Sequence, residues 1–572
     1  MTVPTELDLV TVHCALAEAF PDREAVVQGS RRHSWAVFEE RTGRLARFLA
    51  SKGLGCHVER PLLAPHRSGQ DHVGIYLHNS IEYLEAMLGS LRARTAPFNV
   101  NYRYADEELT HLLRDADTRA LVYHATFAPA LARVLPTSDR EVVLVQVADD
   151  SGNELLPGAI EYEEALGSAP EITLPVPSPD DLFIIYTGGT TGMPKGVLWR
   201  QGDLLVSALG GRDFGHGGRE WASVAELVTS AGRGGYRALP AAPFMHAAAQ
   251  WVAFQALHSG GTVVLPERAA RFDAEDVVRL IEAESVEVLQ IVGDPFAVPL
   301  VAALRAATTL SRLRVVASGG TLLRQETKAA LAELVPGLKI RDSMGASETG
   351  PQAQTTAVGR GANSAVFQPG PGTCVVDEAR TGVLDEGDEI GWLATAGRVP
   401  LGYLHDAVKT AQTFPIVGGR RMAVPGDRAR RLSDGTVEVL GRDSTTINTG
   451  GEKVFAQEVE TVLAGHPAVD DVLVVGRASQ RWGHEVVALV KLRPGSGLTL
   501  EEAGAHCDTR LASYKKPRAL LLTDTIVRSD AGKPDYRWAA LVASGSIDPT
   551  HQDKPSPTVA SLGAVVERNA HA

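Results

Sequence analysis

Short apolar runs rich in β-branched residues alternate with helical or loop segments along most of the 572-residue chain. Two of the intervening segments, residues 35–53 and 81–92, are predicted to be helices. The first places apolar residues on one helical face and ends at a glycine. Buried strands separated by helices predict an α/β fold. The strand candidates are residues 72–77, 120–124, 141–147, 262–266, 287–293 and 313–318.

The chain length predicts at least two domains, because one hydrophobic core rarely extends over so many residues. A change in character near residue 441 separates a large N-terminal domain of α/β subdomains, residues 1–440, from a small α+β domain, residues 441–546. Residues 547–572 are rich in Pro, Ser and Thr and are predicted to be disordered. The small domain is predicted to contain helices at 456–464 and 501–512 and strands at 471–476 and 485–492, and the glycine-rich residues 208–236 are predicted to be a loop or insertion.

Charge and cysteine content limit the partners and the compartment. The formal net charge of −13 argues against a nucleic acid or an anionic membrane as the main partner, because both require a concentrated basic face. The N-terminal residues lack the features of a secretory signal, and no window has the apolar length of a membrane span. We therefore expect a cytoplasmic enzyme without disulfides. The four cysteines have no metal-ligand spacing and are Cys14, Cys56, Cys374 and Cys507.

A strand candidate at residues 181–186, DLFIIY, continues directly into TGGTTGMPKG at 187–196. Its glycines allow the backbone N–H groups to converge, while its threonines and lysine add hydroxyl donors and a cation, which suits phosphate oxygens. A flexible surface loop is the alternative, but so many Thr, Gly, Pro and Lys residues directly after a buried strand are unusual for one. The predicted phosphate-binding residues are Thr187, Gly188, Gly189, Thr190, Thr191, Gly192 and Lys195.

This loop is not a Walker A loop, which has lysine directly after glycine and a hydroxyl residue directly after the lysine. Here Lys195 lies between Pro194 and Gly196. The segment instead resembles the phosphate-binding loop of the adenylate-forming superfamily, which includes acyl-CoA synthetases, luciferases and the adenylation domains of peptide synthetases. Four further segments resemble that superfamily in its order and extend across most of the chain.

The resemblance implies a nucleotide site built from two glycine-containing segments. In VASGGTLL (316–323), Gly319, Gly320 and Thr321 correspond to residues that lie against adenine, although a tight strand-to-helix turn would use the same glycines. In DSMGASETG (342–350), Glu348 corresponds to the Mg²⁺-binding glutamate, and an oxygen ligand suits Mg²⁺ on ATP phosphates. Met344 stands where the family often has an aromatic residue. The nucleotide contacts implied in this segment are Asp342, Ser343, Met344, Gly345 and Ser347.

The domain junction also follows the family pattern. Asp427 matches the aspartate that binds the ribose hydroxyls, and Arg442 matches the arginine between the domains. The hinge position, usually Asp or Lys, falls on Ser444. Gly450 and Gly451 correspond to the glycine pair that lines the pantetheine passage, although a tight turn would also explain them.

Lys533, in AGKPDYRW (531–538), matches the catalytic lysine of the family. The resemblance implies that Lys533, Thr190 and Glu348 with Mg²⁺ stabilise the attack of a carboxylate on ATP, which gives acyl-AMP and pyrophosphate. Coenzyme A then takes the acyl group after the small, mobile domain swings about the junction at 442–444. The expected enzyme is an AMP-forming acid–CoA ligase of lipid metabolism.

The segment APFMHAAAQ (242–250) resembles the family stretch beside the acyl pocket. His246 is either a gate near the carboxylate or a hydrogen-bonded core histidine. The small residues Ala247, Ala248 and Ala249 leave room for a hydrophobic acid, which could be long-chain, steroid-like or terpenoid. Residues 197–203 and 291–300 resemble actinobacterial synthetases for fatty acids and steroid side-chain acids.

Two other functions compete with this prediction. An acyl-adenylating enzyme could load a carrier protein or oxidise its adenylate, but no carrier domain follows in this sequence. A non-catalytic nucleotide-binding protein is disfavoured because the residues expected to be catalytic are retained. The predicted partners are therefore a small carboxylic acid and CoA. The family resemblance implies a homodimer.

Overall fold

The computed structural model describes residues 6–135, 141–187, 193–213, 217–306, 312–321, 323–358, 366–387, 389–449, 452–479, 482–508, 510–528 and 533–547. The chain divides into two compact units. Unit 1 comprises Met1–Ser444 and Asp530–Lys533, and unit 2 comprises Thr445–Ser529 and Pro534–Ala572. The sequence placed the division at 440/441. The mixed α/β architecture, with a large N-terminal part and a separate C-terminal part, confirms the predicted fold class.

The first sheet of unit 1 combines a parallel and an antiparallel part. Strands β1 and β12–β16 pair in parallel, in the order β1-β13-β12-β14-β15-β16, and β2 pairs with β1 in antiparallel orientation. These strands are β1 (Glu24–Gln28), β2 (Arg31–Ser34), β12 (Arg237–Pro240), β13 (Thr262–Leu265), β14 (Val288–Ile291), β15 (Val315–Gly319) and β16 (Lys339–Ala346).

From β16 the same sheet continues through antiparallel pairs toward the end of unit 1. These strands are β17 (Gly350–Val358), β18 (Val366–Pro369), β19 (Thr373–Val376), β20 (Gly391–Ala396), β22 (Ile416–Val417), β23 (Arg420–Ala423), β24 (Asp427–Arg431) and β25 (Val437–Arg442). Two small apolar clusters form their core, one around Trp392 and Met422 and the other around Leu393 and Val437.

The second sheet of unit 1 has the order β21-β9-β8-β4-β3-β5-β6-β7. Its strands are β3 (His72–Tyr76), β4 (Ala96–Asn99), β5 (Thr118–His124), β6 (Val143–Val147), β7 (Ile160–Glu161), β8 (Leu182–Thr187), β9 (Lys195–Arg200) and β21 (Gly402–Tyr403). Pairing is parallel from β8 to β7, whereas β8 and β9 form an antiparallel hairpin to which β21 adds.

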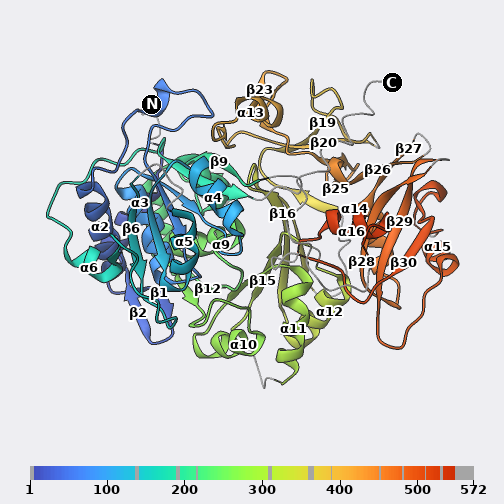
Figure 1. Ribbon diagram of the computed structural model, residues 1–572, viewed down its shortest axis with the longest axis horizontal. Coiled ribbons are helices and arrows are strands. Elements are labelled where there is room, and N and C mark those ends of the chain that lie inside the picture. The colour runs from blue at the N-terminus through green and yellow to red at the C-terminus, as the bar shows by residue number, and fades with distance from the viewer. Residues whose placement is uncertain are drawn as a thin grey trace. The chain divides into compact units, whose positions relative to one another are not determined.

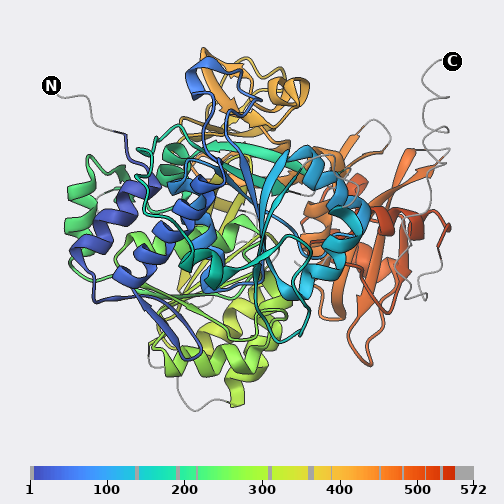
Figure 2. The same ribbon diagram turned by 60° about the vertical axis from the view of Figure 1, so that its left-hand side comes forward.

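Helices cover both sheets of unit 1. The largest apolar core contains side chains from both sheets and from α1, α2, α3, α7 and α9. In Figures 1 and 2 the blue N-terminal helices pack together, and the green helices α10–α12 lie along the strands around β15. The helices are α1 (Leu9–Ala19), α2 (Trp35–Ser51), α3 (Ile81–Arg92), α4 (Asp106–Asp115), α5 (Ala128–Val134), α6 (Tyr162–Gly167), α7 (Gln201–Ala208), α8 (Val224–Ala231), α9 (Ala247–His258), α10 (Ala274–Ala283), α11 (Gly293–Ala306), α12 (Gln325–Leu334) and α13 (Ala407–Thr413).

Unit 2 is a small sheet with helices on both faces. Its strand order is β27-β26-β29-β28, and β30 adds in parallel to β29. One apolar cluster joins the sheet to α14 and α15, and the other joins it to α16. The elements are β26 (Thr446–Thr449), β27 (Glu452–Phe455), α14 (Ala456–Ala464), β28 (Val469–Ser479), β29 (Gly483–Leu492), α15 (Leu500–Asp508), β30 (Ala519–Leu522) and α16 (Tyr536–Ala543).

The glycine-rich segment 208–236 differs from its prediction as a loop or insertion. It contains a short hairpin, β10 (Arg212–Asp213) and β11 (Arg219–Glu220), followed by helix α8. The Ser223 hydroxyl caps α8 by accepting a hydrogen bond from the Glu226 N–H, and Leu227 and Ala231 are buried. A capped helix with an apolar face is therefore embedded among the glycines.

Within the described ranges, none of the helices combines the length and the apolar character that are needed to cross a bilayer.

Candidate functional site

The predicted phosphate loop connects the two strands of the β8–β9 hairpin. Thr187 pairs with Lys195 at the end of this hairpin, so both sides of the loop are fixed by the sheet. Residues 188–192, which include the predicted contacts Gly188, Gly189, Thr190, Thr191 and Gly192, lie outside the described residues. The hairpin therefore brings Thr187 and Lys195 together at the position from which the loop leaves the sheet.

Tyr403 joins the two predicted charged groups of this region. Its hydroxyl donates a hydrogen bond of 2.8 Å to Oε1 of Glu348, and the Nζ of Lys195 lies 5.8 Å from the centre of its ring. Lys195 also forms an ion pair of 2.8 Å with Asp406. Burial and the Glu348 charge raise the pKa of Tyr403, so its phenol stays protonated and remains a donor.

The Ser347–Glu348 segment forms the turn between β16 and β17. The Thr349 N–H donates to the Ala346 carbonyl at 3.1 Å and closes the turn, which leaves Glu348 at its tip. The Trp199 indole N–H, from β9, donates to the Ser347 carbonyl at 2.8 Å. Strand β9 and its neighbour β21 thus hold the turn through both the backbone and the Glu348 carboxylate.

The predicted adenine contacts Gly319, Gly320 and Thr321 lie at the carboxyl end of β15, beside its parallel neighbour β16. Gly319 on β15 pairs with Ser343 on β16, and a Cβ on Gly319 would lie 2.9 Å from the Ser343 carbonyl oxygen. Gly320 has a φ of +88°, which favours glycine. The glycine pair is therefore required by the close approach of the strands and by the turn that follows. Ligands of open α/β sheets bind at such strand ends.

Asp342 and Met344 face neighbouring protein. The Asp342 carboxylate forms an ion pair of 2.8 Å with Lys328 of α12, and the Lys328 side chain is only 1% exposed. Burial raises the pKa of Asp342, and Lys328 opposes that effect. Met344 packs against the apolar cluster around Leu393 and Val437. These contacts give both residues a packing role beside the nucleotide-binding role predicted for them.

Asp427 and Arg442 face each other across the β24–β25 pair. The Arg442 Nε lies 3.3 Å from Oδ1 of Asp427, whose side chain is largely buried. Asp427 raises the pKa of Arg442, and the Glu348 charge acts in the same direction. Ser444 follows within the 3₁₀ turn Asp443–Thr445. The structure therefore brings Asp427 and Arg442 together and places the charge of Glu348 within their electrostatic reach.

Lys533 is grouped with unit 1 by its contacts. Its pKa is lowered because surrounding protein desolvates the ammonium group and because Arg442 is positively charged, whereas Glu348 opposes this shift. The predicted pantetheine contacts Gly450 and Gly451 lie outside the described residues.

His246 precedes helix α9, and its Nε2 is buried without a hydrogen-bond partner among the residues that the structure describes. Burial lowers the pKa of His246 to about 3, with smaller contributions from Lys533 and Arg103, so the imidazole is neutral at physiological pH. Among the described residues this nitrogen lacks the hydrogen bond expected of a core histidine, and the role of His246 as a gate stays a prediction. A buried polar atom of this kind marks a place where a ligand could supply the missing bond.

Buried polar side chains hold the segment that carries His246. Asn99, at the end of β4, donates to the carbonyls of Tyr186 and Met245 at 2.9 and 2.7 Å and accepts from the Tyr186 N–H at 2.8 Å. The Oδ1 of Asn79 accepts a hydrogen bond of 2.6 Å from the Phe244 N–H. Asn99 thus connects the strand that leads into the phosphate loop with the residue before His246.

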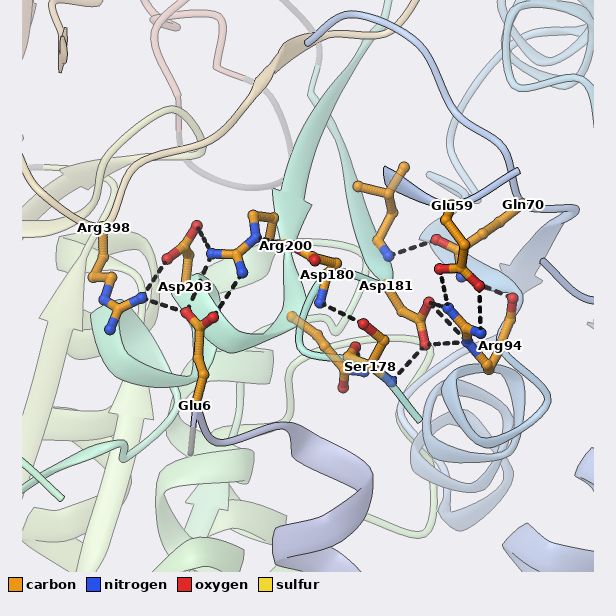
Figure 3. Close-up of polar contacts among 12 residues, drawn as sticks. Glu6, Glu59, Gln70, Arg94, Ser178, Asp180, Asp181, Arg200, Asp203 and Arg398 are labelled. Carbon is orange, nitrogen blue, oxygen red and sulfur yellow. Dashed lines mark hydrogen bonds and ion pairs between the residues drawn. The ribbon is translucent and has the colours of Figure 1, made fainter. Parts of the chain in front are cut away.

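Charged residues hold the opposite end of the β8–β9 hairpin (Figure 3). Arg200, the last residue of β9, bonds to Asp180, Asp203 and Glu6, and Arg398 also contacts Glu6 and Asp203. Arg398 lies shortly before Tyr403 in the chain. The network therefore fixes both the hairpin and the segment that leads to Tyr403.

A second group of charges in Figure 3 fixes the start of β8. Arg94 donates to Asp181 at 2.9 Å and to Glu59 at 2.8 Å, and the Asp181 side chain is 2% exposed. We expect Arg94→Met to lower the free energy of unfolding by about 3 kcal/mol, because it leaves a buried carboxylate without its cation. Chemical denaturation measures this change.

The matched control is Arg133→Met, which removes an ion pair with Asp106 whose two side chains are both at least half exposed. We expect it to leave stability unchanged, since exposed pairs are screened by water. Equal stability of the Arg94→Met and wild-type proteins would contradict the structural role assigned to Arg94.

Tyr403, Trp199 and Asn99 were missed by sequence reasoning. Tyr403 is 55 residues from Glu348 and Trp199 is 148 residues from Ser347, so no local spacing reveals either contact. Asn99 offered one signal, since it is a polar residue at the end of an apolar strand segment.

Two family models match this chain. The family described as "AMP-binding enzyme" matches residues 15–404, and the "AMP-binding enzyme C-terminal domain" matches residues 458–533. The chain belongs to the AMP-binding enzyme family. This membership confirms the resemblance to adenylate-forming enzymes that the motifs predicted, and the second match ends at Lys533.

Among similar family members, Medium-chain acyl-CoA ligase Mig of Mycobacterium avium is 50% identical over 94% of this chain and 98% of its own. The 3-oxocholest-4-en-26-oate–CoA ligase of Rhodococcus rhodochrous is 39% identical over 91% and 93%, respectively. The solved anthranilate CoA ligase AuaEII with anthranoyl-AMP has a TM-score of 0.77 at 20% identity, covering 95% of this chain and 98% of its own. At that identity the solved structure supports the fold alone.

Proposed function

We propose that this chain is an ATP-dependent, AMP-forming acyl-CoA synthetase for a hydrophobic carboxylic acid. The observation that carries the proposal is the grouping of Lys195, Glu348 and Arg442 around Tyr403, beside the hairpin that carries the phosphate loop. Two cations, together with the Glu348 carboxylate that the Tyr403 hydroxyl positions, suit a nucleoside triphosphate and its counter-ion. The similarity to two acyl-CoA ligases over more than nine-tenths of the chain supports the same reaction.

In the first half-reaction an acid oxygen attacks the α-phosphorus of ATP. The bond between the α- and β-phosphates breaks, and pyrophosphate leaves with the electron pair. Lys195 and the loop at 187–196 would hold the phosphates. Asp427 would hold the ribose hydroxyls, and Gly319 with the facing Ser343 would contact the adenine. Lys533 would lie between the acid oxygen and the α-phosphate, where its charge lowers the repulsion between two anions.

Mg²⁺ is proposed to bind beside Glu348. Among the described residues there is no cluster of three or more His, Cys, Asp or Glu side chains that could enclose a metal. Mg²⁺ on a nucleotide usually takes one or two carboxylates and completes its shell with phosphates and water. Glu348 would supply one carboxylate, held by the Tyr403 hydroxyl. When bound, Mg²⁺ would neutralise phosphate charge.

In the second half-reaction the CoA sulfur attacks the acyl carbon, and the bond between that carbon and the AMP oxygen breaks. Lys533 is proposed to have no task in this step, because the sulfur attacks carbon and no carboxylate approaches the α-phosphate. We propose that unit 2 changes its position about residues 442–444 between the two steps and that Gly450 and Gly451 line the pantetheine passage in the second.

The acid is proposed to be a medium-chain fatty acid or a steroid side-chain acid, as the names of the two relatives suggest. Ala247 and Ala249 at the start of α9 are small and buried, and they follow His246 with its unsatisfied ring nitrogen. A carboxylic acid that entered beside His246 could bond to that nitrogen in its donor tautomer.

Pyrophosphate release with a panel of fatty, aryl, steroid and terpenoid acids tests this proposal. We expect the highest kcat/KM among medium-chain or steroid side-chain acids and little release with aryl acids. Measuring AMP release with CoA and with a holo carrier protein tests the acceptor. Release that depended on the carrier protein instead of CoA would favour the alternative of an enzyme that loads carrier proteins.

Tyr403→Phe is expected to lower kcat/KM for Mg-ATP about tenfold, because a hydrogen bond to a charged group is lost. The ring that packs beside Lys195 is kept, so the protein should fold normally. Steady-state kinetics with varied Mg-ATP measure the effect, and the KM values for acid and CoA serve as internal controls. An unchanged kcat/KM for Mg-ATP would show that Tyr403 does not position Glu348.

The proposal extends to a cytoplasmic location, where ATP and CoA are available, and to a homodimer. Light scattering of the purified protein measures the oligomeric state.

A further inference from the structure

The chain on either side of Lys533 is paired within unit 2. Arg528 and Pro534 form an antiparallel bridge, and the Asp535 N–H donates to the Val527 carbonyl at 3.0 Å. Asp535 then caps α16 by accepting from the Trp538 N–H at 2.9 Å. The backbone on both sides of the connection at 529–533 is therefore paired or capped.

A side-chain ion pair fixes the entry to this connection. The Arg528 guanidinium meets Asp471 with two parallel hydrogen bonds, from Nε to Oδ2 at 2.9 Å and from a terminal nitrogen to Oδ1 at 2.7 Å. Asp471 lies on β28, the end strand of the unit 2 sheet, which packs against both α14 and α16. A bidentate pair of this kind restricts the orientation of the guanidinium group as well as its distance from the carboxylate.

A buried hydrogen bond fixes the exit. The Tyr536 hydroxyl donates to Oε2 of Glu460 at 3.0 Å, and the Val474 N–H of β28 donates to Oε1 at 2.8 Å. Burial raises the pKa of Glu460 to about 7, and the two donors act against that rise. Figure 1 shows α14, which carries Glu460, and α16, which begins at Tyr536, near β28.

The two contacts both lead to β28: Arg528 bonds to Asp471 on this strand, and Tyr536 bonds to Glu460, which in turn accepts from Val474 of this strand. The Tyr536 ring also packs against the two apolar clusters on either face of the sheet. Apolar side chains at these positions would stabilise the fold at a lower free-energy cost, because burying a carboxylate is unfavourable. Two polar contacts instead fix the backbone at Arg528 and at Tyr536, on the two sides of Lys533.

We propose that Asp471, Arg528, Glu460 and Tyr536 form a clamp that positions Lys533 for adenylation. The clamp residues are positioning residues, because they act through Lys533 and do not touch the substrates. The inference rests on the proposed role of Lys533. Freeing one end of the connection would let the ammonium group move by an ångström or more, and misplacement on this scale costs up to about 10²-fold in rate.

The test uses Asp471→Asn and Tyr536→Phe, singly and together, in the full chain. Asp471→Asn removes the charge and one of the two acceptors that Arg528 uses, and Tyr536→Phe removes the hydrogen bond to Glu460; both keep the side-chain shape. We expect the double variant to form acyl-AMP about 10- to 100-fold more slowly, measured by pyrophosphate release. Conversion of supplied acyl-AMP to acyl-CoA should change less than about twofold, because that step does not use Lys533.

Glu485→Gln is the matched control. It removes the Arg477–Glu485 pair of 2.8 Å, which is about as buried as the Arg528–Asp471 pair and lies on the same sheet. Both half-reactions should keep their wild-type rates. A selective loss of adenylation in the clamp variants, absent from Glu485→Gln, would support the clamp.

Lys533→Ala is measured beside these variants. If it loses adenylation while the folded double variant adenylates normally, the clamp is overturned and the proposed function stands. If the double variant loses both half-reactions equally, the four residues serve stability only and the clamp is again overturned. If Lys533→Ala adenylates normally, the proposed role of Lys533 fails and the clamp fails with it. Tyr536→Phe alone should also slow adenylation selectively, but by a smaller factor. This single variant keeps the test valid if the double variant does not fold.

Discussion

Replacement of Lys533 by alanine is expected to lower the rate of acyl-AMP formation by about 10²- to 10³-fold, as for the loss of one preorganised charge that stabilises a transition state. The physical reason is the approach of a carboxylate to a phosphate, in which two anions must share one region. The lowered pKa of Lys533 reflects desolvation and a second cation, Arg442, so its charge is expected to act in a partly water-excluded environment.

The same variant should convert supplied acyl-AMP to acyl-CoA at nearly the wild-type rate. Pyrophosphate release reports the first half-reaction, and acyl-CoA formation from synthetic acyl-AMP reports the second. Lys491→Ala removes a lysine of unit 2 that pairs with Asp470 at the surface, and it should leave both rates unchanged. Equal loss of both half-reactions in a folded Lys533→Ala protein would contradict the role proposed for the lysine.

Replacement of Glu348 by glutamine is expected to have the second-largest effect, a loss of about 10²-fold in kcat/KM for Mg-ATP. Glutamine keeps the shape of the side chain, and its carbonyl oxygen can still accept the Tyr403 hydroxyl, as Oε1 of Glu348 does at 2.8 Å. What is lost is the negative charge, and a neutral amide is a weaker ligand for a hard cation.

Calorimetric titration with ATP separates binding from catalysis. Wild-type protein should bind ATP more tightly when Mg²⁺ is present, whereas Glu348→Gln should show little gain. Glu386→Gln, which changes an exposed carboxylate 3.7 Å from Arg431, serves as the control and should behave like the wild type. A Glu348→Gln protein with the full Mg²⁺-dependent gain would contradict the assignment of Glu348.

Local signals in the sequence predicted much of the fold. Helices α3 and α14 have the bounds predicted for them, and the Ser80 side chain caps the start of α3. Helix α8 was missed among glycines, although Ser223 and Glu226 have the spacing of a helix start. Its burial against the N-terminal helix α1 is a long-range contact that composition does not reveal.

For the candidate site, motif spacing led to Lys195, Glu348, Asp427 and Arg442, and strand pairing accounts for two of their relations. Asp427 faces Arg442 because β24 and β25 pair in that register, and Thr187 faces Lys195 across the β8–β9 hairpin. The residues that hold them could not be predicted, since Tyr403 reaches Glu348 only after β21 adds to β9. Side-chain partners across a sheet edge are a property of the folded chain.

The path of one oxygen atom tests the central claim most directly. The acid is supplied with oxygen-18 in its carboxyl group, together with ATP and CoA, and the products are analysed by mass spectrometry. If the acid oxygen attacks the α-phosphorus and CoA then breaks the acyl carbon–oxygen bond, AMP carries the label and acyl-CoA is formed in equal amount. Label in inorganic phosphate, with ADP as the nucleotide product, would contradict adenylation by this chain.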